Sequence, residues 1–402
     1  MSWTCPFCPL LCDGFALSEG LELEGSDCPR ARRGLAQAAP AANDAPAAID
    51  ARAATLDDAL AEAARILSAS RQPLFGGLAT DVAGARALYR LAAACGAIYD
   101  HAHGRSAMHA LRALQDRGAF ATTLAEVRNR SDLIVCLTGS PSAAYPEFFR
   151  RCGVGEPLVD ARHVVFVGGP PDETLSGVGG VSVESVALEG DLFSAVAELG
   201  ACLARPPRAS SLAQLARRLA EARYAVIAYD LASLPAHGEL IVEQVTRIVI
   251  ALNETTRAAA LPLGGADGAS TANQVFAWLS GLPLRSRVGP RGIEHEPLLY
   301  DTERLIARRE VDALLWVSSF TPALVPPRVD VPVVLLGHPA MTPPARGVSI
   351  AVATPGIGAA GHLFRTDGVV MMPLFAVRED RMPEVAEVVE RLRATMLAED
   401  DR

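Results

Sequence analysis

Lysine is absent from the whole 402-residue chain, and all 37 basic residues are arginine. This absence excludes Schiff-base chemistry on a lysine, a lysine general base and the lysine-dependent phosphate loop of many nucleotide-binding enzymes. Recognition of anions remains open, because an arginine guanidinium binds carboxylates and phosphates in a planar, bidentate manner.

Long apolar runs are also missing, since no stretch reaches the eighteen or more apolar residues of a membrane-spanning helix. The first residues lack the basic segment and apolar core of a secretory signal. We therefore expect a cytoplasmic protein without a membrane-bound part, in which thiols stay reduced. The formal net charge of −9 argues against nucleic acid as a partner, because phosphate backbones favour basic surfaces.

Cysteine, in contrast, is concentrated at the start of the chain. Four of the eight cysteines lie in the first 28 residues, at Cys5, Cys8, Cys12 and Cys28. Residues 15–24 have the pattern of a short hairpin, which would bring the fourth thiol back to the other three. Such thiolates suit zinc or an iron–sulfur cluster, and the uneven spacing favours a [4Fe–4S] cluster over the paired knuckles of a zinc ribbon. Ordinary buried cysteines are the remaining alternative.

From residue 55 onward the sequence alternates between helical and strand patterns. Residues 55–68 begin with a threonine cap and two acids and predict a helix, residues 73–78 predict a buried strand, and residues 81–94 predict a second helix. Further continuous apolar runs occupy residues 131–137, 163–167, 224–228, 313–317 and 332–336. Runs bounded by turns and separated by helices are typical of parallel strands covered on both faces. The predicted fold class is therefore α/β, with Rossmann-like parallel sheets covered by helices.

We expect three domains. Residues 1–50 form a small cysteine module, which we expect to pack with residues 350–402. Residues 51–98 and 220–349 together form one Rossmann-like domain, and residues 99–219 are inserted into it as a second. A chain of this length supports such a division, because single hydrophobic cores stop growing beyond about 250–300 residues.

Three stretches, together with the cysteine module, carry a resemblance to a known family. They are residues 100–135, which open with DHAHGRS; residues 268–291, with WLSGLP and SRVGPR; and residues 361–369, GHLFRTDGV. A four-cysteine module ahead of Rossmann-like domains resembles the molybdopterin and tungstopterin oxidoreductases. The three stretches, in this order, are similar to the B subunit of formylmethanofuran dehydrogenase, and the resemblance covers nearly the whole chain.

One position departs from this family. In the dehydrogenases the loop has a cysteine or selenocysteine that binds molybdenum or tungsten, where this chain has Ala102. A methyl group cannot ligate a metal, so the resemblance implies a dehydrogenase site without its chemistry. The family's lysine between cluster and pterin is also absent, because Cys28 is followed by Pro29 and Arg30. We therefore expect no molybdopterin or tungstopterin, and a compact cysteine knot with or without a [4Fe–4S] cluster as a staple.

This loss matches the B subunit of the formyltransferase/hydrolase complex of methylotrophic bacteria. By resemblance, that complex moves a formyl group from tetrahydromethanopterin to methanofuran and releases it as formate, with its hydrolytic metal and its transferase site on other subunits. The leading interpretation is a structural, carrier-binding subunit with an amidohydrolase-like, a formyltransferase-like and a C-type partner. Two alternatives remain: an active molybdenum or tungsten formylmethanofuran or formate dehydrogenase, and an electron-transfer module that uses the cluster alone.

Three further residues are candidates for ligand binding: His103, Arg287 and Arg291. By resemblance they match positions that line the dehydrogenase pocket, where they could hold formate, a carboxylate of methanofuran's polyglutamate tail or part of a retained nucleotide. The alternative is that they remain in a solvent-filled cleft without a role. His101 and His109 complete a histidine cluster with His103. No carboxylate other than Asp100 stands at the spacing found in metalloenzymes, which argues against a metal there.

Overall fold

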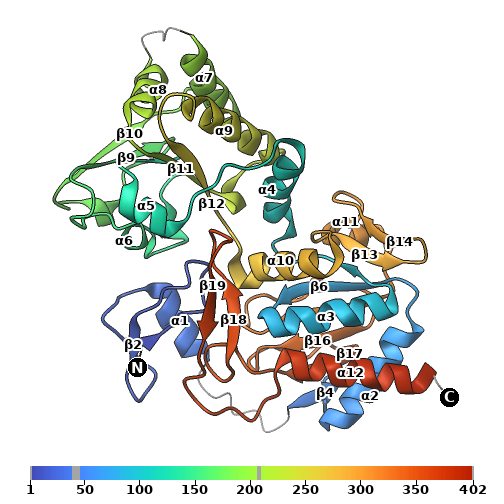
Figure 1. The fold of residues 1–402 in the computed structure, drawn as a ribbon. Helices are drawn as coiled ribbons and strands as arrows, with labels where there is room; N and C mark the ends of the chain where they lie inside the picture. The colour runs from blue at the N-terminus through green and yellow to red at the C-terminus, as the bar shows by residue number, and fades with distance from the viewer. Residues whose placement is uncertain (1, 39–45, 206–209, 401–402) are drawn as a thin grey trace. The chain divides into compact units, whose positions relative to one another are not determined.

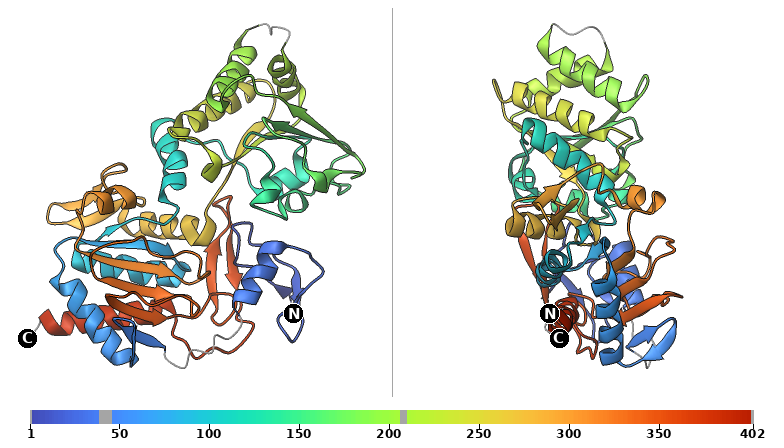
Figure 2. Two further views of the ribbon diagram at one scale, coloured as in Figure 1. Left: turned by 180° about the vertical axis from the view of Figure 1, so that it is seen from behind. Right: turned by 90° about the vertical axis from the view of Figure 1, so that its right-hand side faces the viewer.

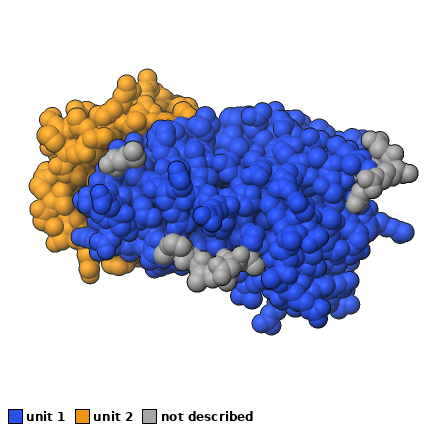
Figure 3. Space-filling view, turned by 90° about the horizontal axis from the view of Figure 1, so that it is seen from below, with its two compact units in different colours: residues 1–105, 265–365, 371–402 blue, residues 106–264, 366–370 orange. Residues whose placement is uncertain are grey.

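The computed structural model describes residues 2–38, 46–205 and 210–400. The chain divides into two compact units (Figure 3). Unit 1 comprises residues 1–105, 265–365 and 371–402, and unit 2 comprises residues 106–264 and 366–370. Among the described residues, no helix is both long enough and apolar enough to cross a membrane.

Unit 1 is built on a large mixed sheet, which has nine strands among the described residues. In spatial order these are β14 (Gly292–His295), β13 (Ser286–Gly289), β7 (Ile98–Tyr99), β6 (Pro73–Ala79), β15 (Ala313–Ser318), β16 (Val333–Gly337), β17 (Gly347–Ala351), β4 (Ala47–Ile49) and β5 (Arg52–Ala54). The strands from β7 to β17 are parallel, and an antiparallel hairpin lies at each edge. The predicted buried strands therefore form the centre of the sheet, and the α/β fold class is confirmed.

Four helices lie side by side over one face of this sheet (Figure 1). Their order is α10 (Ala269–Ser280), α3 (Val82–Cys95), α12 (Val385–Asp400) and α2 (Leu56–Ala69). Both α2 and α3 begin where the sequence predicts. The Thr55 hydroxyl accepts a hydrogen bond from the Asp58 amide at 3.1 Å, and the Asp81 carboxylate accepts one from the Gly84 amide at 2.9 Å. These caps satisfy amides that the first helical turn leaves without a partner.

The cysteine module forms the N-terminal part of unit 1. Its elements are β1 (Ser2–Trp3), β2 (Phe15–Leu17), β3 (Leu23–Glu24) and α1 (Pro29–Gln37). The predicted hairpin is confirmed, because β2 and β3 pair with Ala16 opposite Glu24. The module lies beside a second hairpin, β18 (Gly361–Phe364) and β19 (Met371–Leu374) (Figure 2). The Trp3 indole donates a hydrogen bond to the Gly356 carbonyl at 2.9 Å, which ties the module to the C-terminal part of the chain.

Unit 2 contains a parallel sheet of five strands in the described residues, covered by helices. Its strands, in spatial order, are β10 (Val181–Val186), β9 (Arg162–Val167), β8 (Leu133–Cys136), β11 (Ala225–Asp230) and β12 (Ala258–Leu263). The associated helices are α4 (Gly104–Arg117), α5 (Leu124–Arg130), α6 (Phe148–Arg151), α7 (Leu192–Ala204), α8 (Ser211–Glu221) and α9 (Gly238–Leu252). Apolar residues of β8 and β11 share one core with α7, α8 and α9, so these strands are buried as their continuous apolar sequences indicate.

The inserted unit is longer than the sequence analysis expects. The predicted boundary assigns residues 220–264 to the outer Rossmann-like domain, but β11 and β12 extend the sheet of unit 2. Both sheets contain buried parallel strands, whose continuous apolar patterns do not reveal which sheet a strand joins. The predicted cysteine module belongs to unit 1 in the structure, and its residues 39–45 lie outside the described residues.

Candidate functional site

The loop that contains Ala102 follows β7 and is held by the backbone of β6. The Asp100 amide donates to the Phe75 carbonyl at 3.0 Å, and the Ala102 amide donates to the Gly77 carbonyl at 3.2 Å. Gly77 has φ +71°, next to an irregularity in the pairing of β6 with β15. A Cβ on Gly77 would lie 2.4 Å from the Val317 carbonyl oxygen, so this turn requires glycine. The end of β6 thus fixes the position of the Ala102 methyl group.

Asp100 anchors the same loop from inside the protein. Its carboxylate accepts hydrogen bonds from the His101 amide at 3.0 Å and from the Thr302 amide and hydroxyl at 3.1 Å each, and it lies 3.3 Å from Arg285 Nε. Burial raises the pKa of Asp100 to about 6, although Arg285 and Thr302 act in the opposite direction. A Cβ on Gly104 would lie 2.1 Å from this carboxylate, so the chain must have glycine where α4 begins.

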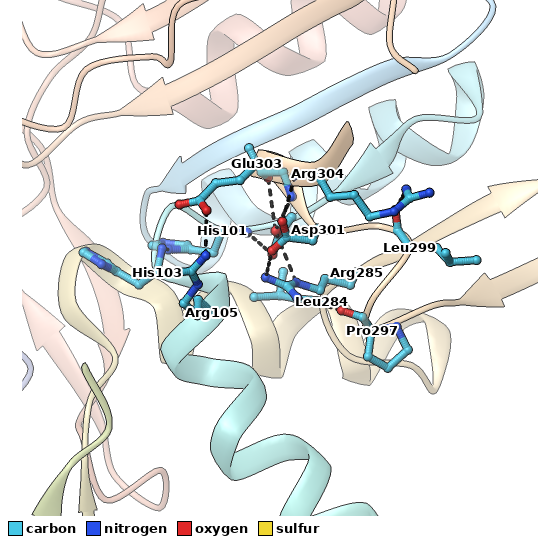
Figure 4. A network of polar contacts seen from close by, with 12 residues as sticks. His101, His103, Arg105, Leu284, Arg285, Pro297, Leu299, Asp301, Glu303 and Arg304 are labelled. Carbon is cyan, nitrogen blue, oxygen red and sulfur yellow. Dashed lines mark hydrogen bonds and ion pairs between the residues drawn. The ribbon is translucent and has the colours of Figure 1, made fainter. Parts of the chain in front are cut away.

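Arg285 is a buried cation that sequence reasoning missed. Its guanidinium donates to the Asp301 carboxylate at 2.5 Å and to the Pro297 carbonyl at 2.7 Å (Figure 4). With Asp100 on its other side, this arginine joins the loop to the segment before α11 (Thr302–Ala307). Nothing in its local sequence distinguishes it from the other arginines, because its partners come from distant segments.

His101 and His103 converge on Asp267, a second residue that sequence reasoning missed. His103 Nε2 lies 2.8 Å from Asp267 Oδ2, and His101 Nε2 lies 3.2 Å from the Asp267 carbonyl. The two imidazole rings are stacked with centroids 5.5 Å apart. Burial acts to raise the pKa of Asp267, but the hydrogen bond from His103 and the electrostatic interactions with His103, His101 and Arg30 outweigh it and hold that pKa below its usual range.

Both ring nitrogens of His101 are used to hold the loop. Nδ1 accepts the His103 amide at 3.0 Å, and Nε2 donates to the carbonyl of Asp267, so these partners define a neutral tautomer. Burial, and then the charge of His103, lower the pKa of His101 to about 3. His101 is therefore a neutral structural residue at neutral pH, and neither nitrogen is available to a metal.

The two other candidate arginines lie on the hairpin of β13 and β14. Arg287 Nε donates to Glu294 at 2.7 Å, and Arg291 Nη2 lies 3.1 Å from the same carboxylate. The Arg287 guanidinium also lies over the Tyr300 ring, 5.6 Å from its centroid. Arg287, followed by the Tyr300 hydroxyl, lowers the pKa of Glu294 to about 2. Arg287 and Arg291 thus converge on Glu294, whereas His103 pairs with Asp267.

The four N-terminal cysteines are all buried, and backbone hydrogen bonds fold the segment from Cys5 to Cys12 back on itself. The Cys5 amide donates to the Cys12 carbonyl at 2.9 Å, and the Leu11 amide donates to the Cys8 carbonyl at 3.0 Å. Burial raises the pKa of the Cys5 thiol, and the nearby thiols of Cys8, Cys12 and Cys28 raise it further. Within the described residues, however, no group of three or more cysteine, histidine or acidic side chains is arranged to hold a metal ion. The donor chemistry of the four thiols nevertheless suits a cluster.

Two known proteins that are similar to this chain are B subunits of multi-subunit complexes. The chain is 34% identical over 280 residues to the B subunit of the formyltransferase/hydrolase complex Fhc of Methylorubrum extorquens, covering 66% of this chain and 73% of the relative. It is 26% identical over 345 residues to the B subunit of the tungsten-containing formylmethanofuran dehydrogenase 2 of Methanocaldococcus jannaschii, covering 78% and 77% of the two chains. No protein-family model matches the chain.

A solved structure agrees with the sequence comparison. It is the crystal structure of the formyltransferase/hydrolase complex FhcABCD from Methylorubrum extorquens in complex with methylofuran. One of its chains superposes with a TM-score of 0.77 at 29% identity, covering 89% of this chain and 100% of that chain. The similarity therefore extends over the fold as well as the sequence.

Proposed function

The chain belongs to the family of B subunits of formyltransferase/hydrolase complexes, and from this premise we propose that it is the B subunit of such a complex. In this role it supports the transfer of a formyl group from a tetrahydromethanopterin carrier to a methanofuran-type carrier and its release as formate. The reacting groups belong to other subunits. The solved relative is a complex with methylofuran, which supports the choice of carrier.

The observation that carries this proposal is the methyl group of Ala102. The backbone of β6 holds the loop at Gly77. By resemblance, Ala102 occupies the position of the dehydrogenases' metal ligand, and its side chain has no donor atom. The flanking histidines do not compensate, because His101 uses both ring nitrogens and His103 pairs with Asp267. We propose that the chain's own dehydrogenase site is inactive.

The proposed partners are an amidohydrolase-like, a formyltransferase-like and a C-type subunit, together with the methanofuran-type carrier. Among the candidate ligand-binding residues, the Arg291 side chain is 85% exposed, so its guanidinium can take up a carboxylate of the carrier. Arg287 orients Glu294 and through it Arg291. His103 is the candidate in the loop itself.

The cysteine knot has a structural role in this proposal. A [4Fe–4S] cluster assembled on Cys5, Cys8, Cys12 and Cys28 would staple a module that has little core of its own, and it would pass no electrons to a pterin. We place the complex in the cytoplasm, where thiols stay reduced.

Affinity purification of the tagged chain from its own cells tests this function. We expect three further subunits in the eluate, release of formate from the formyl carrier, and neither molybdenum nor tungsten at stoichiometric amounts. A lone polypeptide that reduces a viologen dye with formate, and carries near-stoichiometric molybdenum or tungsten, would show that the dehydrogenase alternative is correct.

A conservative variant tests whether the side chain at position 102 takes part in the activity. Ala102→Ser adds one hydroxyl at the position of the missing ligand, and we expect assembly and formate release to stay within about twofold of the wild type, because no reacting atom is bound there. An iron and sulfide assay on anaerobically purified protein, read with the absorption near 400 nm, decides whether the knot carries a cluster.

A further inference from the structure

Unit 2 contains a pocket that the proposed function does not use. Its volume is about 820 Å³, and all of its lining residues lie between positions 120 and 259. It is located at the amino ends of the parallel strands, since Arg223 and Tyr224 precede β11, Arg257 precedes β12, and Leu158 precedes β9. Open α/β sheets usually bind ligands at the opposite, carboxyl ends, so this pocket is separate from that crevice.

Three arginines give the pocket its positive groups. Arg257 donates to the carbonyl of Thr256 at 3.2 Å and has no carboxylate partner within the described part of the chain. Arg130 lies 3.4 Å from Glu126 with its side chain 70% exposed, and Arg223 lies 3.6 Å from an aspartate with its side chain 72% exposed. Exposed ion pairs of this kind contribute little, so a ligand anion can replace them at low cost.

Only one of these arginines lies where it can stabilise the end of a helix. Arg130 is the last residue of α5 and interacts favourably with the negative end of that helix. Arg223 and Arg257 lie in loops that lead into strands, beyond the last residues of α8 and α9. The positions of these two guanidinium groups are therefore not explained by stabilisation of a helix end.

Apolar side chains lie on the same pocket. Phe120 is 47% exposed and Leu158 is 51% exposed. The Tyr224 ring forms part of the lining, while its hydroxyl donates to the Thr122 hydroxyl at 2.8 Å. Large apolar groups beside arginines, in a pocket of this size, are typical of sites for small molecules that have an apolar body and a charged group. The exposed carboxylate of Asp160 adds an acceptor for a donor group of the ligand.

We propose that this pocket binds a small anion with a planar apolar body, such as an aromatic carboxylate or phosphate. Arg257, assisted by Arg130 and Arg223, holds the anionic group, and the body packs against Phe120 and Leu158. The inference does not depend on the proposed function, because none of these residues belongs to the loop of Ala102 or to the cysteine knot.

A fluorescent probe with this chemistry, anilinonaphthalene sulfonate, tests the proposal on the folded full-length chain. We expect saturable binding, displaced by inorganic phosphate, and an affinity about tenfold lower in Arg257→Ala, as the loss of one charge-assisted bond predicts. Phe120→Ala should lower the affinity for the probe, while inorganic phosphate should still displace it. The matched control is Arg309→Ala, which removes an exposed arginine of unit 1 and should leave the affinity unchanged.

Two results would overturn the inference. Equal probe affinity in the wild type and Arg257→Ala would show that the arginines do not form a site. Binding to the isolated chain that disappears in the purified complex would show that another subunit covers this surface, which would then be an interface. Because Arg257 is exposed, its replacement should leave the fold intact. The near-ultraviolet circular dichroism spectrum of each variant should therefore match that of the wild type.

Discussion

Single residues around Ala102 hold the shape of its loop through hydrogen bonds and ion pairs within the protein. Its backbone amides donate hydrogen bonds to carbonyls of β6 and to the Asp100 carboxylate, and Asp267 holds both histidines. Arg30 of α1 helps to lower the pKa of Asp267, so the cysteine module contributes charge to the same site. The buried carboxylate of Asp100 has the opposite behaviour, with a raised pKa, and this difference can be measured.

Asp100→Asn should change how stability depends on pH. The pKa of Asp100 is about 6 in the folded protein and about 3.9 when unfolded, so the folded state binds the proton more tightly. This contribution to stability is fully present below about pH 4 and is lost as the pH rises through 6, a change of roughly 3 kcal/mol. The wild type should therefore gain melting temperature relative to Asp100→Asn as the pH falls from 7 to 5.

The exposed carboxylate of Asp57 provides the control for this measurement. Its side chain is 85% exposed, so Asp57→Asn should leave the pH profile parallel to that of the wild type. Parallel profiles for Asp100→Asn as well would contradict the raised pKa.

At the scale of elements, two of the helices over the large sheet, α2 and α3, begin at residues whose side chains cap them. The Thr55 cap is exposed, whereas Asp81 is 7% exposed, beside the β18 hairpin, where a Cβ on Gly361 would lie 2.9 Å from its carboxylate. The Asp81 carboxylate therefore both caps α3 and packs against the β18 hairpin. Its loss should cost more than the loss of an exposed cap.

Asp81→Ala should lower the free energy of unfolding by about 2 kcal/mol, because it removes the acceptor for the Gly84 amide inside the protein. Asp81→Asn keeps an acceptor of the same shape and should stay within a few tenths of a kcal/mol of the wild type. Urea denaturation followed by circular dichroism measures both. Equal destabilisation by the two substitutions would point to the charge instead of the cap.

The whole molecule consists of two units with separate cores. In unit 1, Phe320 and Leu11 share a cluster with Leu363 and Leu374, so the cysteine module packs on the β18–β19 hairpin and the central sheet. In unit 2, the apolar residues of β8, β9 and β11 pack with α7, α8 and α9. A cavity in the core of unit 1 should therefore loosen the packing around the four cysteines. A cavity in the core of unit 2 should leave that packing unchanged.

Phe320→Ala should destabilise unit 1 by about 3–5 kcal/mol and speed the labelling of Cys5, Cys8, Cys12 and Cys28 by a thiol reagent. Phe166→Ala removes an equally buried ring from unit 2, so it should cost a similar free energy and leave labelling of those four residues unchanged. Mass spectrometry of the labelled peptides distinguishes the sites. Faster labelling in both variants would show that the units do not open separately.

The sequence alone determined the features that depend on local patterns. The alternation of helices and strands, the cap at Thr55, the helix that starts at Asp81 and the hairpin after Cys12 follow from side chains a few residues apart, and the structure confirms them. The presence of Ala102 in its loop was also evident from the sequence.

Only the tertiary structure decided which distant residues meet. It paired His103 with Asp267, 164 positions away, placed Arg285 against Asp100, and added β11 and β12 to the inserted sheet. It also showed that Arg287 and Arg291 share Glu294 and that two loop arginines line a pocket in unit 2. Such pairings depend on the packing of whole elements, and chain-distant polar groups carry no periodic signal that could reveal them.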